Sequence, residues 1–231
     1  MTNTIGGLPV YPSKSDIPDP SLLCLCHDEN GLSLVGDGLT LRGDFTKLLP
    51  RLKPNNLSSE LLVKAAKIKK VDGTPTAVDA TAGLGEDALL LAAAGFRVTM
   101  FEYDPVIAAL LHDALDRAAK VPELAEIVSR MTLCEGDSIA ALPSLHPNVV
   151  FLDPMFPERQ KSALIKKKFQ LLQQLERPCP NEDDLLAAAL AASPRKVVIK
   201  RPLKGPFLAG RKPSYSLSGK AVRYDCLVLP R

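Results

Sequence analysis

The chain of 231 residues is long enough for one large domain or for a domain with a small appendage. Hydrophobic residues make up 46% of it and charged residues 24%, as in a packed globular protein. No apolar run approaches the ~20 residues of a membrane helix, and the N-terminus lacks the pattern of a secretory signal. The five cysteines are scattered and odd in number, which favours free thiols. We therefore expect a cytoplasmic protein with no membrane partner.

The C-terminal third carries an excess of positive charge that the net charge of +3 hides. Residues 158–231 contain 16 Lys or Arg and 6 Asp or Glu, a balance of +10. Residues 1–157 contain 13 basic and 20 acidic residues, a balance of −7. A basic segment of this kind favours contact with a polyanion such as nucleic acid, and a solvated Lys-rich surface is the alternative.

The first part of the chain predicts a small β-rich appendage and a linker over residues 1–56. Residues 22–27 and 32–35 flank an Asp-Glu-Asn-Gly turn, which is typical of a β-hairpin. Residues 39–42 predict a further strand, and the Pro- and Asn-containing segment Pro50–Asn56 predicts the linker. A second, larger domain is then expected over residues 57–231.

Helical and strand patterns alternate along this larger domain. Helices are predicted over residues 57–70, 86–94, 105–120, 161–175 and 182–192, and strands over 76–80, 97–102, 131–135, 148–153, 196–200 and 222–229. The alternation indicates an α/β fold, with a mostly parallel sheet that is covered on both faces. In such sheets, ligands bind at the carboxyl ends of the strands near the topological switch point.

A glycine loop joins the first of these strands to its helix. Gly83 and Gly85 permit a tight turn and the close approach of a ligand to the backbone. The start of the following helix offers unpaired N–H groups. Glu102 ends the next strand, 17 residues after Gly85, and suits a grip on the two ribose hydroxyls of a nucleoside.

Two nucleoside cofactors fit this loop. Residues 83–88 match the G-x-G-x-x-G/A fingerprint of dinucleotide-binding proteins. However, Glu86 and Asp87 would repel a pyrophosphate at the helix start, whereas Asp79 can meet the cationic methionine end of S-adenosylmethionine. We therefore favour S-adenosylmethionine as the cofactor. The remaining interpretation is that the glycines only form a turn and that the acids cap the helix.

The segment Asp153–Pro157 reads Asp-Pro-Met-Phe-Pro and follows a buried strand. It resembles the Asp/Asn-Pro-Pro-aromatic motif of methyltransferases that modify exocyclic amino groups, with Met155 in place of the second proline. Asp153 and nearby carbonyls would accept hydrogen bonds from the amine, Pro154 would stiffen the loop, and Phe156 would stack on the base. These three residues are the predicted catalytic set, and catalysis would come mainly from positioning.

Together these motifs, with residues 160–164 and 200–202, resemble the RsmJ family of small-subunit ribosomal RNA guanine-N2 methyltransferases over about residues 58–228. The resemblance implies a Rossmann-like class I methyltransferase fold and methylation of the guanosine N2 amine in small-subunit (16S) ribosomal RNA. Family members carry a basic, Gly-rich stretch where this chain has Pro50–Asn56. The implied cofactor contacts, beyond Asp79, Gly83, Gly85 and Glu102, are Glu86, Asp87, Tyr103, Asp137, Ser138 and Asp153.

The RNA or the small ribosomal subunit is the expected partner, and two groups of basic residues are candidates to bind it. These are Lys161, Lys166, Lys167 and Lys168 after the Asp153 loop, and Lys200 and Arg201 at a strand end. A solvated helix face and a strand-end pair that covers a loop are the alternatives. The Cys-Leu-Cys-His run at residues 24–27 lacks the second pair of ligands that a zinc site needs, so no metal is expected.

Three functions remain open from the sequence. The first is the ribosomal RNA methyltransferase, which accounts for the glycine loop, Glu102 and Asp153. The second is a nicotinamide-dependent oxidoreductase that uses the Gly83-x-Gly85 loop. The third is a non-catalytic RNA-binding protein on a methyltransferase fold. Fold alone does not decide among them.

Overall fold

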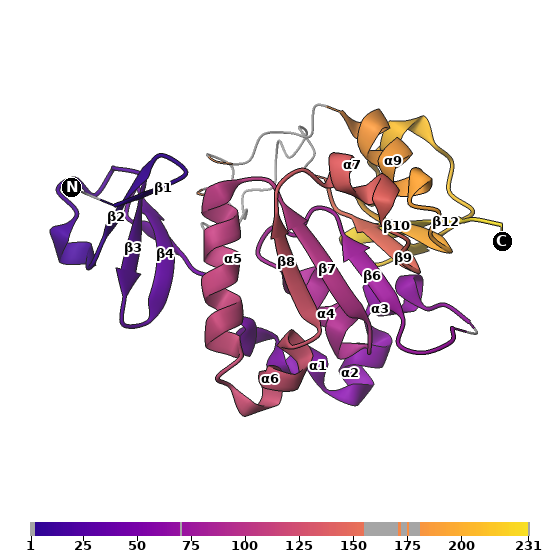
Figure 1. Cartoon of the computed structure of the whole chain (residues 1–231), viewed down its shortest axis with the longest axis horizontal. Helices are drawn as coiled ribbons and strands as arrows, with labels where there is room; N and C mark the ends of the chain where they lie inside the picture. The colour runs from indigo at the N-terminus through magenta and orange to yellow at the C-terminus, as the bar shows by residue number, and fades with distance from the viewer. Residues whose placement is uncertain (1–2, 70, 155–170, 172–174, 176–180, 231) are drawn as a thin grey trace.

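The structure is a computed structural model that describes residues 3–69, 71–154, 171, 175 and 181–230. Within these residues the strands form one sheet of five strands and one of seven. The small sheet and the large sheet lie on opposite sides of helix α5 (Pro105–Ala118) (Figure 1). No helix of the described ranges combines the length and the apolar character that crossing a membrane requires.

The five-stranded sheet is built from the N-terminal residues in chain order. Its strands are β1 (Thr4–Ile5), β2 (Leu8–Tyr11), β3 (Cys24–Asp28), β4 (Gly31–Gly36) and β5 (Leu39–Leu41). The predicted hairpin is confirmed, because β3 and β4 pair antiparallel and Gly31 closes the turn with a φ of 103°. Strands β1 and β2 were not predicted, because they are only two and four residues long and β2 contains a proline.

One face of the small sheet packs against α5. Leu25, Leu34 and Leu41 are buried in one cluster with Ile107 and Leu110 of the helix. Full burial of each such side chain contributes about 1.5–3 kcal/mol. A hydrogen bond of 2.6 Å from Arg117 of α5 to the carbonyl of Gly43 adds a polar tie. The sheet is therefore docked on the larger unit through apolar contact.

The prediction of a linker over Pro50–Asn56 is wrong. The chain instead forms a series of short helices: η2 (Phe45–Leu48), α1 (Leu49–Leu52), α2 (Pro54–Ser59) and α3 (Leu61–Ala66). The predicted helix over residues 57–70 is correspondingly shorter, and it is interrupted at Glu60, where ψ is 130°. Proline at the start of α2 favours an extended residue before it. The carboxylate of Glu60 receives two hydrogen bonds from Arg51, of 2.7 and 2.9 Å, which hold the turn between these helices.

The seven-stranded sheet has the order β11-β12-β10-β9-β6-β7-β8. These strands are β6 (Thr76–Asp79), β7 (Arg97–Glu102), β8 (Met131–Glu135), β9 (Val149–Leu152), β10 (Lys196–Pro202), β11 (Tyr215–Ser218) and β12 (Val222–Val228). The five strands from β8 to β10 are parallel, and β12 runs antiparallel to both of its neighbours. The predicted mostly parallel sheet is confirmed. The prediction lacked β11, which lies in a Gly- and Ser-containing segment.

Both faces of this sheet are covered, as expected. One core cluster joins α3, α4 (Glu86–Ala93), α6 (Pro122–Val128) and part of α5 to the sheet. The other face packs against α7 (Ser138–Ala141), η3 (Leu142–Ser144), α9 (Glu182–Ala191) and η4 (Leu208–Gly210). The chain passes from β6 outward to β7 and β8 and then returns to β9 on the other side of β6. The topological switch point therefore lies between β6 and β9, where ligands bind in folds of this class.

Candidate functional site

The carboxyl ends of β6 and β9 are joined directly at the switch point. The amide of Ala80 donates to the carbonyl of Phe151 over 3.1 Å, and the amide of Asp153 donates to Oγ1 of Thr81 over 2.7 Å. These bonds place Asp79, the last residue of β6, beside Asp153, which follows β9. The glycine loop and the first residues of the predicted catalytic loop therefore meet at one edge of the sheet.

Asp79 is a buried carboxylate with an unsatisfied oxygen. It is 1% exposed, and its Oδ1 atom accepts a hydrogen bond of 3.1 Å from the amide of Thr81. Its Oδ2 atom has no hydrogen-bond partner among the described residues. Burial raises the pKa of Asp79 well above its usual value, and the nearby Asp87 and Asp153 raise it further. An orphaned buried acceptor is costly, so this atom suits the cationic or N–H group of a ligand.

The two glycines of the loop have different local surroundings. Both adopt positive φ, 54° at Gly83 and 75° at Gly85. A Cβ atom at Gly85 would lie 2.7 Å from Cδ1 of Leu111, whereas a Cβ atom at Gly83 would meet nothing within 4 Å. Gly85 is therefore required for packing against α5. Gly83 faces open space, which leaves its backbone accessible to a ligand.

Glu102, at the end of β7, holds two loops together. Its Oε2 atom accepts from the amide of Gly83 over 2.8 Å, and its Oε1 atom accepts from the amide of Asp104 over 2.9 Å. Burial raises the pKa of Glu102, and these backbone hydrogen bonds oppose the change. Each carboxylate oxygen can accept a further bond, so the arrangement is compatible with a grip on ribose hydroxyls. Tyr103 beside it is 80% exposed.

The end of β8 adds a further part of the same edge. The amide of Gly136 donates to the carbonyl of Glu102 over 2.8 Å. Asp137 caps helix α7 by accepting from the amide of Ile139 over 2.8 Å, and Ser138 is buried. The predicted cofactor residues of the three strands β6, β7 and β8 thus lie in one row along the carboxyl edge.

Lys200 is the residue whose place the sequence analysis did not predict. Its Nζ atom lies 2.5 Å from Oδ2 of Asp87 and 2.9 Å from Oδ2 of Asp153. Burial acts to lower the pKa of Lys200, but the two carboxylates outweigh it and the net pKa is raised. Lys200 therefore links β10, the first turn of α4 and the segment after β9. The structure places this ammonium inside the acidic cluster.

The neighbouring Arg201 lies on the other side of β10 and is 1% exposed. Its Nη1 atom lies 3.3 Å from Oε1 of Glu182, and its Nε atom donates to the carbonyl of Pro206 over 2.9 Å. Burial lowers the pKa of Arg201 to about 10. This position leaves the predicted contact of Arg201 with RNA without structural support, because the guanidinium is enclosed by α9 and the loop after β10.

Several predicted residues lie outside the described part of the chain. They are Phe156 of the predicted catalytic loop and the predicted RNA-binding residues Lys161, Lys166, Lys167 and Lys168. Pro154 is described and buried. The searched residues contain no group of three or more His, Cys, Asp or Glu side chains arranged to hold a metal ion. Cys24 and Cys26 are buried free thiols in the small sheet.

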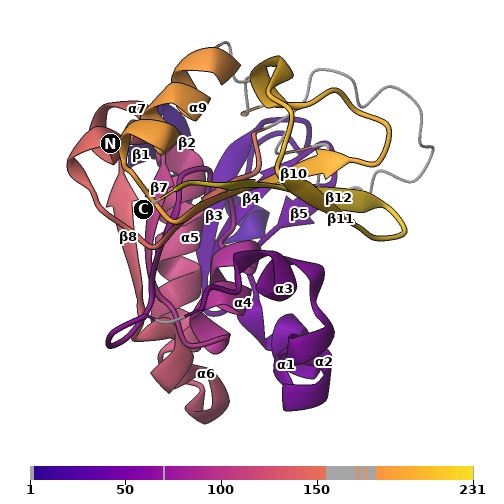
Figure 2. The same cartoon turned by 90° about the vertical axis from the view of Figure 1, so that its right-hand side faces the viewer.

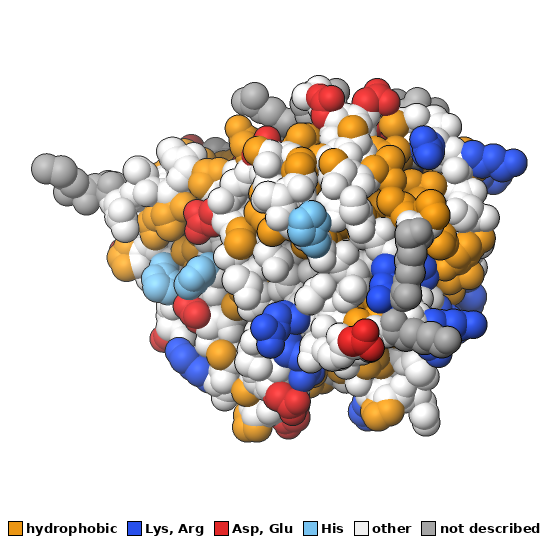
Figure 3. Space-filling view, turned by 45° about the vertical axis from the view of Figure 1, so that its right-hand side comes forward, with side chains coloured by type: hydrophobic (Ala, Val, Ile, Leu, Met, Phe, Trp, Pro, Cys, Tyr) orange, Lys and Arg blue, Asp and Glu red, His pale blue; other side chains and the backbone are white. Residues whose placement is uncertain are grey.

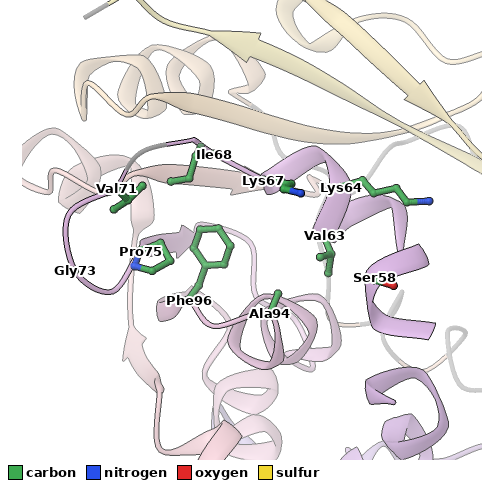
Figure 4. Close-up of a pocket in the computed structure, with 10 residues that line it drawn as sticks. All are labelled: Ser58, Val63, Lys64, Lys67, Ile68, Val71, Gly73, Pro75, Ala94 and Phe96. Carbon is green, nitrogen blue, oxygen red and sulfur yellow. The ribbon is translucent and has the colours of Figure 1, made fainter. Parts of the chain in front are cut away.

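A shallow groove of about 600 Å³ lies at the opposite edge of the large sheet (Figure 4). Pro75 and Phe96, which line it, directly precede β6 and β7, so the groove is at the amino ends of these strands. Its other walls include Val63, Lys64 and Lys67. It contains none of the acidic residues described above, and it is separated from them by the length of the strands.

Comparisons with known proteins agree with this geometry. Residues 23–229 match the model of a family described as "Putative SAM-dependent methyltransferase". A curated relative from Thioalkalivibrio sulfidiphilus, named ribosomal RNA small subunit methyltransferase J, is 45% identical over 216 residues, which cover 89% of this chain and 84% of the relative. A relative of the same name from Pseudomonas fluorescens is 46% identical over 171 residues, which cover 73% of this chain and 65% of the relative. The chain thus spans just under two thirds of the latter's length.

A solved structure shows the same similarity in three dimensions. It is a SAM-dependent methyltransferase from Neisseria gonorrhoeae, with a TM-score of 0.74 and 32% sequence identity. The match covers 92% of this chain and 85% of the solved chain. The predicted Rossmann-like α/β methyltransferase fold with its mostly parallel sheet is therefore confirmed. Because the family model matches residues 23–229 and the curated relative is 45% identical over 89% of the chain, the chain belongs to the RsmJ family of S-adenosylmethionine-dependent methyltransferases.

Proposed function

We propose that the chain transfers the methyl group of S-adenosylmethionine to the N2 amine of a guanosine in small-subunit ribosomal RNA. The observation that carries the proposal is the meeting of Asp79, with its orphaned buried oxygen, and Asp153, held by Lys200, at the switch point of the sheet. The curated relatives named as ribosomal RNA small subunit methyltransferase J support the RNA as substrate.

The residues present fit the cofactor. The orphaned Oδ2 atom of Asp79 offers a negative partner for the ammonium group of the methionine part. The backbone at Gly83 is open to close approach, and Glu102 offers the acceptors that a ribose requires. Asp137 and Ser138 complete the row on the side where the adenine would be held. When bound, S-adenosylmethionine supplies an electrophilic methyl group.

The residues of the chain would then orient the acceptor. The guanine amine is a weak nucleophile because its lone pair is delocalised into the ring. Asp153 would accept a hydrogen bond from the amine and direct the lone pair toward the methyl group. Lys200 fixes the Oδ2 atom of Asp153, and the buried Pro154 restricts the backbone at Asp153 before it. Accurate placement of this kind is the main source of rate in transfers without a covalent intermediate.

The two alternative functions find no support in the comparisons. A nicotinamide-dependent oxidoreductase is not supported, because the family model that matches residues 23–229 is that of a methyltransferase. A non-catalytic RNA-binding protein gives no account of the acidic cluster around Lys200. Action on ribosomal RNA is consistent with a cytoplasmic protein whose partner is the small ribosomal subunit or its RNA. We include the cytoplasmic location and this partner in the proposal.

The test is methyl transfer to small ribosomal subunits from a strain that lacks the gene. The protein, Asp153→Ala and the exposed control Asp116→Ala would be incubated with radiolabelled S-adenosylmethionine, and the RNA would be digested to nucleosides. We expect label in N2-methylguanosine with the wild type and the control, and no label with Asp153→Ala, which lacks the acceptor oxygen. Label in another nucleoside would reject the guanosine N2 assignment, and full activity of Asp153→Ala would reject the mechanism.

A further inference from the structure

Two arginine side chains shape the loop that follows β10. Arg223 of β12 donates from Nη1 to the carbonyls of Pro202 and Leu203 over 3.0 and 2.8 Å. Its Nη2 atom donates to the carbonyl of Pro206 over 3.3 Å, and Nε of Arg201 reaches the same carbonyl over 2.9 Å. The loop over residues 202–207 is thus held by four hydrogen bonds from two guanidinium groups.

Both arginines are buried and are paired with acidic side chains. Arg201 lies 3.3 Å from Glu182 of α9, and Nε of Arg223 lies 3.0 Å from Asp225. Asp225 also accepts a hydrogen bond of 2.5 Å from Ser216 of β11. Burying guanidinium groups is costly and is tolerated only with such partners. This bracing gives the loop one defined conformation, which lowers the entropy cost of binding through it.

The braced loop presents a ring, an apolar side chain and a cation to the exterior. Leu203 and Phe207 are each 38% exposed, and Lys204 between them is exposed. The guanidinium carbon of Arg223 lies 5.1 Å from the centre of the Phe207 ring, so the ring is held in place by a cation–π contact. Proteins that bind single-stranded nucleic acids use partly exposed aromatic rings, on which the bases stack, together with basic side chains that contact the backbone.

The loop lies at the same edge of the sheet as the acidic cluster. It begins two residues after Lys200, which contacts Asp153. Pro202 is paired in register with Val222, so the turn between β11 and β12, with the exposed Lys220, lies beside it (Figure 2). Residues 203–222 contain Lys204, Arg211, Lys212 and Lys220 and no acidic residue. Figure 3 shows Lys and Arg side chains among hydrophobic ones on the right-hand part of the surface.

We infer that this loop, residues 202–207, binds an unpaired nucleotide of the RNA that flanks the target guanosine. Phe207 would stack on the flanking base, and Lys204 and Lys220 would contact the adjacent phosphates. The charge of the segment favours a polyanion, and the ring favours a nucleic acid over a purely electrostatic partner. This inference rests on the proposed function and assigns the RNA contact to residues that the sequence motifs did not indicate.

The test compares Phe207→Leu, Phe207→Tyr, Lys204→Ala and the control Lys120→Ala. Binding to an in vitro transcript of small-subunit ribosomal RNA would be measured by fluorescence anisotropy at several salt concentrations. Thermal midpoints and the Kd for S-adenosylmethionine would verify folding. We expect Phe207→Leu to weaken RNA binding by about five- to a hundredfold and Phe207→Tyr to stay within about threefold. Lys204→Ala should reduce the slope of log affinity against log salt by about 0.7.

The outcomes separate this inference from the proposed function. If Phe207→Leu and Lys204→Ala have the same RNA affinity and salt slope as the control Lys120→Ala, the inference is overturned, even where the wild type methylates RNA. Absence of RNA binding by the wild type would also overturn it. Conversely, the wild type could bind RNA without methylating guanosine N2, while Phe207→Leu binds the RNA more weakly. That result would reject the proposed function and support the loop as an RNA-binding surface.

Discussion

The Nζ atom of Lys200, in β10, lies 2.9 Å from Oδ2 of Asp153, in the segment that follows β9. The same ammonium lies against Asp87 in the first turn of α4, 113 positions earlier in the chain. One cation thus balances two carboxylates at the point where the methyl acceptor would be oriented. Because Lys200 and its two partners belong to three separate segments of the chain, this contact reports on the geometry of the whole site.

Replacement of Lys200 by Met should lower kcat for methyl transfer by about 10- to 100-fold, because Asp153 loses the group that fixes its oxygen. Lys200→Arg should restore part of the rate, since it keeps the charge. The measurement is kcat and KM for the RNA, together with the Kd for S-adenosylmethionine. Lys120→Met, at an exposed position, is the matched control. A kcat equal to that of the control would show that Lys200 has no positioning role.

Replacement of Asp79 by Asn should weaken the binding of S-adenosylmethionine by tenfold or more, because a buried charge-assisted contact contributes about 1.5–3 kcal/mol. The Kd can be measured by calorimetry. Retention of wild-type affinity would place the methionine part elsewhere. The asparagine keeps the acceptor for the amide of Thr81, so the loop should keep its shape.

The same variant tests the pKa of Asp79. This pKa is raised in the folded state, so the folded protein binds the proton more tightly than the unfolded chain. The contribution of Asp79 to stability is therefore present below its ordinary pKa and is lost as the pH rises through the raised value. Without cofactor, Asp79→Asn should be more stable than the wild type at neutral pH, and the difference should shrink as the pH falls. Urea unfolding at several pH values measures it, and a difference that does not change with pH would contradict the burial of an ionisable carboxyl.

The two glycines of the loop should respond differently to alanine. Gly85→Ala introduces both a positive φ and an overlap with Leu111, so the free energy of unfolding should fall by about 2–5 kcal/mol. Gly83→Ala introduces only the positive φ and should cost about 1–2 kcal/mol, but it should weaken cofactor binding at least tenfold. Chemical unfolding and cofactor titration of both variants check this. Equal effects on cofactor affinity would show that Gly83 does not face the ligand.

The parts of the fold that could be predicted from sequence are those set by short-range patterns. The strand β9 is a continuous apolar run because helices cover both faces of the sheet. Helix α5 follows from Pro105 and from Asp104, which caps it through the amides of Val106 and Ile107. The glycine loop, Glu102 and Asp153 were found because each stands at a strand end. The short helices over residues 45–52 and the start of α2 were missed, because they depend on contacts such as that of Arg51 with Glu60.

The roles of Lys200 and Arg201 could not be separated from spacing, because their partners are distant in the chain. Strand alternation does hold a signal, since successive side chains point to opposite faces. Val198 belongs to the core cluster on the α4 side, and Ile199 belongs to the cluster on the α9 side. Lys200 therefore reaches Asp87 of α4, while Arg201 reaches Glu182 of α9. Only the sheet order shows which acid each residue meets.

The N-terminal sheet should unfold together with the larger unit. Leu34 of β4 is fully buried against α5, so Leu34→Ala should lower the free energy of unfolding by about 2–5 kcal/mol. Because the sheet shares its core with Ile107 and Leu110, we expect a single unfolding transition that shifts as a whole. Urea unfolding followed by circular dichroism measures this, with the partly buried Leu39→Ala as the milder control. If unfolding instead shows two transitions and Leu34→Ala shifts only the first, the division proposed near residue 56 separates independently folding domains.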